Sequence, residues 1–139
     1  MGELKVTALL CDAAQVAEGK LYVLGGGWSI YRSPGRVSMA VAIKIDVPWT
    51  DANRKIPFRA ELVTEDGVAV TDPDGRPVRL EATLEVGRPP GLPAGTPLDL
   101  PLAFRIDIPL GGGGYRWDFF IDDRKATEIS FLVLGVQGA

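Results

Sequence analysis

The stretch VSMAVAIKIDV, residues 37–47, alternates between two kinds of side chain. Its odd positions carry only Val, Met or Ile, whereas its even positions carry Ser, Ala, Lys or Asp. Because successive side chains of a β-strand point to opposite faces of a sheet, this pattern predicts a strand with one buried face. The same period of two recurs in residues 56–62, 80–86, 98–108 and 115–121. The sequence therefore predicts a protein built mainly of strands.

Turn-forming residues separate these segments. Gly, Pro, Ser and Asp cluster at residues 33–35, 65–67, 72–75 and 87–97, which is typical of connections between strands. No segment of ten residues keeps a helical period, and we expect at most one short helical turn near residues 50–54. The pattern predicts an all-β, single-domain antiparallel β-sandwich over residues 1–139, immunoglobulin-like or C2-like, with about eight strands.

The glycine run Gly25–Gly27 resembles a phosphate-binding loop in composition. Such a loop leads from a strand into a helix whose N–H groups face the anion. Residues 28–31 instead alternate as a strand, so we expect a bulge or tight bend where the chain crosses between sheets. Loops at a sandwich end are nevertheless common binding surfaces. The candidate recognition loop consists of Gly25, Gly26, Gly27 and Trp49.

The charge of the chain limits its partners. Its 139 residues carry 15 basic and 18 acidic side chains, a net charge of −3. Without a basic stripe, nucleic-acid binding lacks its usual source of affinity. No apolar run approaches the ~20 residues of a membrane span, and Asp12 interrupts the first apolar stretch before a signal peptide could form. We therefore expect a cytoplasmic protein that binds neither nucleic acid nor membrane.

Catalysis is restricted by missing side chains. The chain has no histidine, which removes the commonest general base near neutral pH. Cys11 is the only cysteine, so an intramolecular disulfide is excluded. We interpret Cys11 as a small buried hydrophobe rather than a nucleophile, which would need an electropositive setting. The sequence predicts no catalytic residue, no cofactor and no enzymatic activity.

Two alternatives to a purely structural reading involve ligands. The segment TDPDGRP, residues 71–77, clusters carboxylates as hard cations require, although it lacks EF-hand spacing. The calcium candidates are Asp66, Asp72 and Asp74, with Asp122 and Asp123 as further ligands. Exposed aromatic rings could stack on a sugar, but Trp117 and Phe119 follow the inward period of their strand. Trp49, after Pro48 at a strand end, is the aromatic side chain that we expect to be exposed.

Both terminal strands are apolar on two faces. In residues 128–136, Phe131 and Val133 belong to one face, whereas Leu132 and Leu134 belong to the other. Residues 4–11 show the same feature. Because exposed apolar patches tend to be partner surfaces, we expect a homo-oligomer or an unidentified protein partner. The candidate interface consists of Leu9, Cys11, Leu132, Leu134 and Val136.

Nearly the whole chain resembles a family of small bacterial proteins of unknown function. The resemblance rests on LLCDAAQVAEGKLYVLGGGW at residues 9–28, on VPW at residues 47–49, on the RPPG loop at residues 88–91 and on GYRW at residues 114–117. The chain departs from the family pattern at Cys11, where a small residue is usual, and at Gly26. The resemblance implies no active site, cofactor or substrate.

Three functional hypotheses follow. The first, which the missing histidine and the doubly apolar strands favour, is a non-enzymatic protein-interaction or assembly module. The alternative is a β-sandwich that binds a small ligand, carbohydrate or calcium through its end loops. The third is an enzyme that uses carboxylate or tyrosine chemistry.

Overall fold

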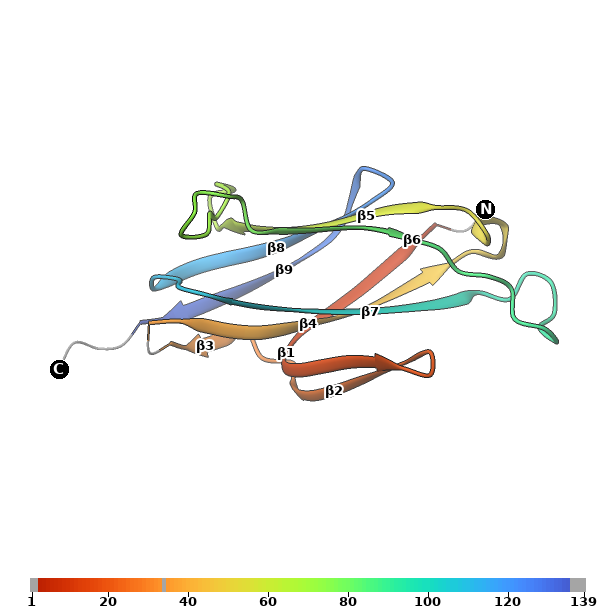
Figure 1. The fold of residues 1–139 in the computed structure, drawn as a ribbon, viewed down its shortest axis with the longest axis horizontal. Helices are drawn as coiled ribbons and strands as arrows, with labels where there is room; N and C mark the ends of the chain where they lie inside the picture. Colours follow the sequence, from red (N-terminus) through yellow and green to blue (C-terminus); the bar gives the residue numbers. More distant parts are fainter. Residues whose placement is uncertain (1–2, 34, 136–139) are drawn as a thin grey trace.

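A computed structural model describes residues 3–33 and 35–135, which form two packed β-sheets (Figure 1). Sheet A has the order β2-β1-β4-β7 and contains β1 (Lys5–Ala17), β2 (Lys20–Gly26), β4 (Val37–Val47) and β7 (Leu98–Ile108). Sheet B has the order β3-β9-β8-β5-β6 and contains β3 (Ile30–Arg32), β5 (Ile56–Thr64), β6 (Arg79–Leu84), β8 (Gly113–Ile121) and β9 (Arg124–Leu134). The predicted β-sandwich is confirmed.

Two details differ from the sequence-based expectation. β3 pairs in parallel with β9, with Ile30 opposite Leu132, whereas the other strand pairs are antiparallel. The chain leaves sheet A after β2 and enters sheet B beside β9 in the same direction. The helical turn is a 3-10 turn at Trp49–Asp51, where Asp51 N–H donates to the Pro48 carbonyl at 2.9 Å.

Residues 3–33 and 35–135 contain no helix that is long and apolar enough to cross a membrane.

The main core lies between the two sheets. The odd residues of β4, from Val37 to Val47, are 0% exposed. Sheet B contributes Trp117 and Phe119, which are also buried, as their period predicted. Phe104 packs edge-on against Trp117 with ring centroids 5.2 Å apart. Because full burial of one such side chain contributes about 1.5–3 kcal/mol, the inward faces stabilise the sandwich.

A second, smaller apolar cluster lies on the outer face of sheet A. Ala40 and Ala42, at even positions of β4, are 2% and 3% exposed, and Cys11 is 0% exposed. All three pack against Ala14 and Leu21 of the β1–β2 hairpin. β1 pairs with β4 as far as Cys11 and with β2 from Cys11 onward. Figure 1 shows that β1 bends between these two parts, so that the hairpin lies below β4 in this view. The hairpin therefore covers a face that the alternation of β4 predicted to be exposed.

Candidate functional site

The β1–β2 hairpin carries half of the large apolar side chains that are exposed in the described part of the chain. Leu24 is 72% exposed, Tyr22 50%, Val16 43% and Val23 40%. Tyr22, Val23 and Leu24 lie on β2 at the edge of sheet A and border a shallow hollow with residues 13–15. An exposed apolar cluster of this kind is typical of a contact surface for another protein. The sequence analysis missed this cluster, because the apolar run at residues 21–24 resembles the sequence of an ordinary core strand.

Hydrogen bonds fix the hairpin to the sandwich. Arg105 of β7 donates from Nη1 to the Asp12 carbonyl oxygen at 3.0 Å and from Nη2 to Ser38 Oγ at 2.6 Å. Beside the bend, the Gly27 N–H donates to the Leu10 carbonyl oxygen at 2.9 Å. Together with the apolar cluster beneath it, these bonds hold the exposed edge in one position.

The expectation that Cys11 lies in a subunit interface is wrong. Its side chain is fully buried within one chain, and Sγ donates to the Ala40 carbonyl oxygen at 3.5 Å. Burial, and secondarily the Asp12 carboxylate, raises the pKa of the Cys11 thiol. The interpretation of Cys11 as a small buried hydrophobe is confirmed, because the hairpin covers it. Leu9 is half-buried beside Gly26.

The other interface candidates lie on β9. Leu132 is 40% exposed and is paired with Ile30 of β3, which is 54% exposed, so the two form a small apolar patch on the outer face of sheet B. Leu134 is half-buried. Val136 lies outside the described residues. A role of Leu132 in association stays a prediction.

The glycine run lies where the chain passes from sheet A to sheet B, as the sequence predicted. The φ angles of Gly25 and Gly27 are +63° and +92°, in the left-handed region that favours glycine. A Cβ at Gly25 would collide with the Asp12 carboxylate, and one at Gly26 would lie 2.8 Å from Val23 Cγ1. The three glycines thus allow a close turn between sheets.

The four residues of the candidate recognition loop do not form one site. Strand pairing places Gly26 opposite Cys11 and Cys11 opposite Ala40, near the start of β4. Trp49 instead follows the far end of that strand. Trp49 is also half-buried rather than exposed, because its ring packs against the core and the Arg88 guanidinium lies 4.5 Å from the ring centroid. The cleft beside Trp49 is lined in part by Pro48 and Gly95.

The calcium candidates lie apart. Asp72 Oδ1 accepts hydrogen bonds from the N–H groups of Asp74 and Arg76, both at 2.9 Å, and so stabilises its own turn. Asp66 belongs to a different turn, in which the Gly67 N–H donates to the Thr64 carbonyl oxygen. Among residues 3–33 and 35–135, no three His, Cys, Asp or Glu side chains gather as metal ligands.

The further ligand candidates Asp122 and Asp123 are engaged by arginines. Arg54 Nη2 lies 2.7 Å from Asp122 Oδ2, and its hydrogen bonds lower the pKa of the Asp122 carboxyl although burial opposes this shift. Asp123 Oδ1 lies 3.6 Å from Arg59 Nη1. Both carboxylates therefore act as partners of arginine in the β8–β9 turn.

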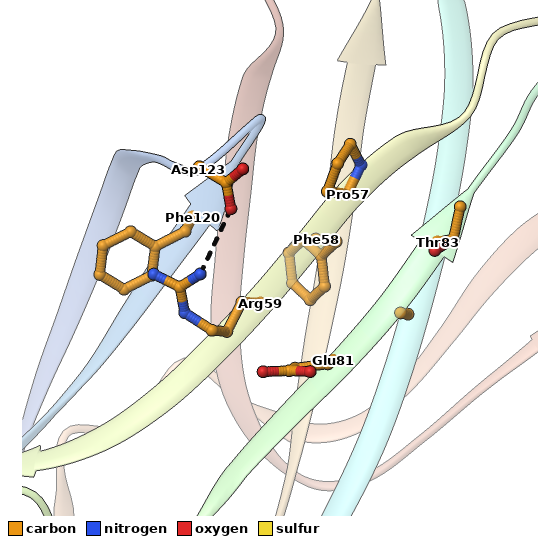
Figure 2. A pocket seen from close by; sticks show the side chains of 8 residues that line it. Pro57, Phe58, Arg59, Glu81, Thr83, Phe120 and Asp123 are labelled. Carbon is orange, nitrogen blue, oxygen red and sulfur yellow. Dashed lines mark ion pairs between the residues drawn. The ribbon is translucent and has the colours of Figure 1, made fainter.

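A polar hollow on the outer face of sheet B escaped sequence reasoning (Figure 2). The Arg59 guanidinium lies 4.2 Å from the centroid of the Phe120 ring, and its Nε lies 2.7 Å from Glu61 Oε2. Figure 2 shows Arg59 and Asp123 pointing toward each other, with Glu81 on the neighbouring strand. Two carboxylates and one ring already surround the cation, so this cluster ties β5 to the β8–β9 hairpin. Only the register, in which Arg59 faces Phe120, brings it together.

Asp118 anchors a second polar cluster on that face. It is 7% exposed, and its Oδ1 lies 2.7 Å from Arg116 Nε and 3.2 Å from Lys125 Nζ. Burial by itself raises the pKa of Asp118, but the hydrogen bonds from Arg116 and Lys125 outweigh burial and lower it. The carboxylate therefore stays ionised at neutral pH, as a structural charge and not as a general acid.

Comparison with known proteins places the chain in a family. The model of a family of unknown function, DUF6941, matches residues 6–134. The chain belongs to this family. This agrees with the resemblance to a family of unknown function that the sequence motifs indicated. No curated protein shows a significant match to the chain.

Several solved structures are similar in fold. Alkylpurine DNA glycosylase AlkC of Pseudomonas fluorescens, bound to DNA with an abasic site analogue, is 8% identical with a TM-score of 0.49 over 94% of this chain. The chain spans only 30% of the length of that glycosylase. An immunoglobulin-like protein of Pseudomonas aeruginosa is 15% identical with a TM-score of 0.43, covering 96% of this chain and 98% of that one.

A third similar structure is a CARDB domain of a Pyrococcus furiosus protein in complex with di-metal ions. It is 14% identical with a TM-score of 0.42, and the match covers 96% of this chain and 88% of that one. At such identities and TM-scores, these likenesses carry no argument about activity or ligands.

Proposed function

We propose that this protein is a non-enzymatic protein-interaction or assembly module whose contact surface is the β1–β2 hairpin. The observation that carries the proposal is the exposed apolar edge formed by Tyr22, Val23 and Leu24 at 50%, 40% and 72% exposure. Water contact of such side chains is unfavourable, and burial against a partner removes it. The hairpin is held in place by Arg105 and by the apolar cluster beneath it, so little ordering is required on association.

The titratable groups support a non-enzymatic role. The pKa of Asp118 and that of Asp122 are lowered, and the pKa of the Cys11 thiol is raised, so each shift moves its group away from neutrality. Efficient general acid–base catalysis needs the opposite direction of shift, toward the working pH. A cytoplasmic location is part of the proposal, because the single thiol of Cys11 is compatible with a reducing compartment.

The test is native mass spectrometry of the protein purified gently from its own cells. We expect each chain to retain a second protein chain, either identical or different. Leu24→Lys should abolish this association, because it places a charge in the contact surface. Val68→Lys is the matched control, since Val68 is 62% exposed but lies in the turn after β5, away from the hairpin. A monomer, alone or with a stoichiometric ion or metabolite, would contradict the proposal.

A further inference from the structure

We propose that the tip of the β1–β2 hairpin, residues 13–24, is a flap that moves away from sheet A as a unit while the sandwich stays folded. Its closed position is the one in Figure 1. Opening uncovers the small outer cluster of Cys11, Ala40 and Ala42 on the outer face of sheet A. The inference goes beyond the proposed function, because it concerns the movement of the hairpin and not the molecule that the hairpin contacts.

The closed flap buries little of its own surface. Within residues 13–24, three residues are half-buried and the others are exposed. Two of the three, Ala14 and Leu21, pack against the small outer cluster, which is separate from the main core. Because hydrophobic stabilisation is roughly proportional to the apolar area removed from water, the flap is held far more weakly than the strands that fill the main core.

The flap joins the sandwich at a break in the strand pairing of the hairpin. β1 pairs with β2 over residues 13–17, and Cys11 pairs with Gly26. The register skips Asp12 and Gly25, which lie between these pairs. Gly25 has a φ of +63°, and a glycine backbone adopts a wide range of conformations. The chain can therefore bend at this break without disturbing the pairing on either side of it, as hinges at the ends of elements do.

One arginine of β7 holds the hinge in the closed position. Arg105 Nη1 donates to the Asp12 carbonyl oxygen at 3.0 Å. Opening breaks this hydrogen bond and moves Leu21 off the small outer cluster, but it leaves the pairing of β4 with β7 and the main core intact. Segments with few buried apolar contacts open locally at a lower free energy than global unfolding. The open form is therefore a minor state of the folded protein.

The side chain of Cys11 reports this opening. It is the only cysteine of the chain, and it is 0% exposed in the closed form. Burial also raises the pKa of its thiol, and the thiolate is the species that reacts. The purified chain is mixed with N-ethylmaleimide at about pH 8, where an exposed thiol reacts readily, and mass spectrometry follows the adduct. We expect labelling about 10³-fold slower than in the unfolded chain, with a weak dependence on urea.

Two leucines of β2 provide a matched pair of variants. Leu21 lies against the small outer cluster, whereas Leu24 is 72% exposed. Leu21→Ala should speed the labelling of Cys11 about 10-fold, and Leu24→Ala should leave it unchanged. Arg105→Ala should speed it about 3- to 10-fold, because the closed form loses the hydrogen bond to Asp12. Equal labelling rates in Leu21→Ala and Leu24→Ala would overturn the flap.

A core variant separates opening of the flap from global unfolding. Ile43 is 0% exposed in the main core, away from the flap. Ile43→Val lowers the stability of the closed and open forms alike relative to the unfolded chain. We expect its midpoint of urea unfolding to fall while the labelling rate of Cys11 without urea stays the same. Labelling that speeds up as much as global stability falls, or that occurs only within the urea unfolding transition, would overturn the proposal.

Discussion

The two edges of sheet A differ in what they offer to another chain. β7 carries Pro101 within the strand and three charged residues with exposed side chains, Asp99, Arg105 and Asp107. Proline lacks an N–H group, and charges resist burial, so both features block the addition of a strand. β2 contains no proline and carries only Lys20 as a charge. One edge of the sheet is thus protected and the other is open, and for this reason we propose the open edge as the contact surface.

The largest effect is expected where the hairpin rests on sheet A. Ala42→Asp would bury a carboxylate at a position 3% exposed, between β4 and the hairpin. We expect a loss of about 3–5 kcal/mol in the free energy of unfolding, because an unpaired charge is costly in an apolar site. Denaturant unfolding measures it. Lys44→Ala, two residues along the same face but exposed, removes only surface ion pairs with Asp46 and Asp99 and should cost about 1 kcal/mol or less. Equal losses would mean that the hairpin does not cover β4.

A smaller loss in the free energy of unfolding is expected on the ionic outer face of sheet B than beneath the hairpin of sheet A. Asp118→Asn leaves Arg116 and Lys125 without their buried partner and should cost about 1–3 kcal/mol at pH 7. Because folding lowers the pKa of Asp118, its stabilisation is present above the unfolded pKa and is lost as the pH falls through the folded pKa.

The pH dependence of unfolding checks this assignment. The difference in stability between the native protein and Asp118→Asn should shrink below about pH 4, near the ordinary pKa of an aspartate. A difference that is constant from pH 7 to pH 2.5 would show that Asp118 contributes by packing and not by charge.

At the glycines of the bend, we expect a substitution to lower the free energy of unfolding by about 1–2 kcal/mol, the usual range for modest overpacking. Gly26→Ala would place a Cβ 2.8 Å from Val23 Cγ1 and 3.2 Å from Leu9 Cδ1, so the side chain at the centre of the open edge must shift. Thermal unfolding measures the loss of stability. Gly111→Ala is the control, since nothing lies within 4 Å of its Cβ and its φ is not positive. A stable Gly26→Ala would mean that the hairpin has room to adjust.

The smallest change in stability is expected from removing the protection of β7. Pro101→Val adds an N–H group to the protected edge and should change stability by less than about 1 kcal/mol at a partly exposed site. Its effect should appear as self-association in light scattering, because an edge without proline can pair with a strand of another copy. If the assembly stays the same, the remaining charges of β7 suffice as protection.

Period-two alternation determined the strands, because it depends only on which face each residue takes. Residues 37–47, 98–108 and 115–121 lie in β4, β7 and β8 as predicted. The inward positions of Trp117 and Phe119 followed from the same rule. The parallel pairing of β3 could not be derived, because direction and neighbours in a sheet depend on where the chain crosses between layers.

The sequence by itself determined the β-sandwich, the lack of histidine chemistry and the buried character of Cys11, since each depends on composition or local pattern. The tertiary structure decided which apolar segments stay exposed. β1 and β2 resemble core strands in sequence, yet the bend after Cys11 buries Cys11 and leaves Tyr22, Val23 and Leu24 at an edge. Exposure depends on contacts between residues distant in sequence, and the alternation of apolar and polar residues does not predict those contacts. The open edge therefore became visible only in the folded chain.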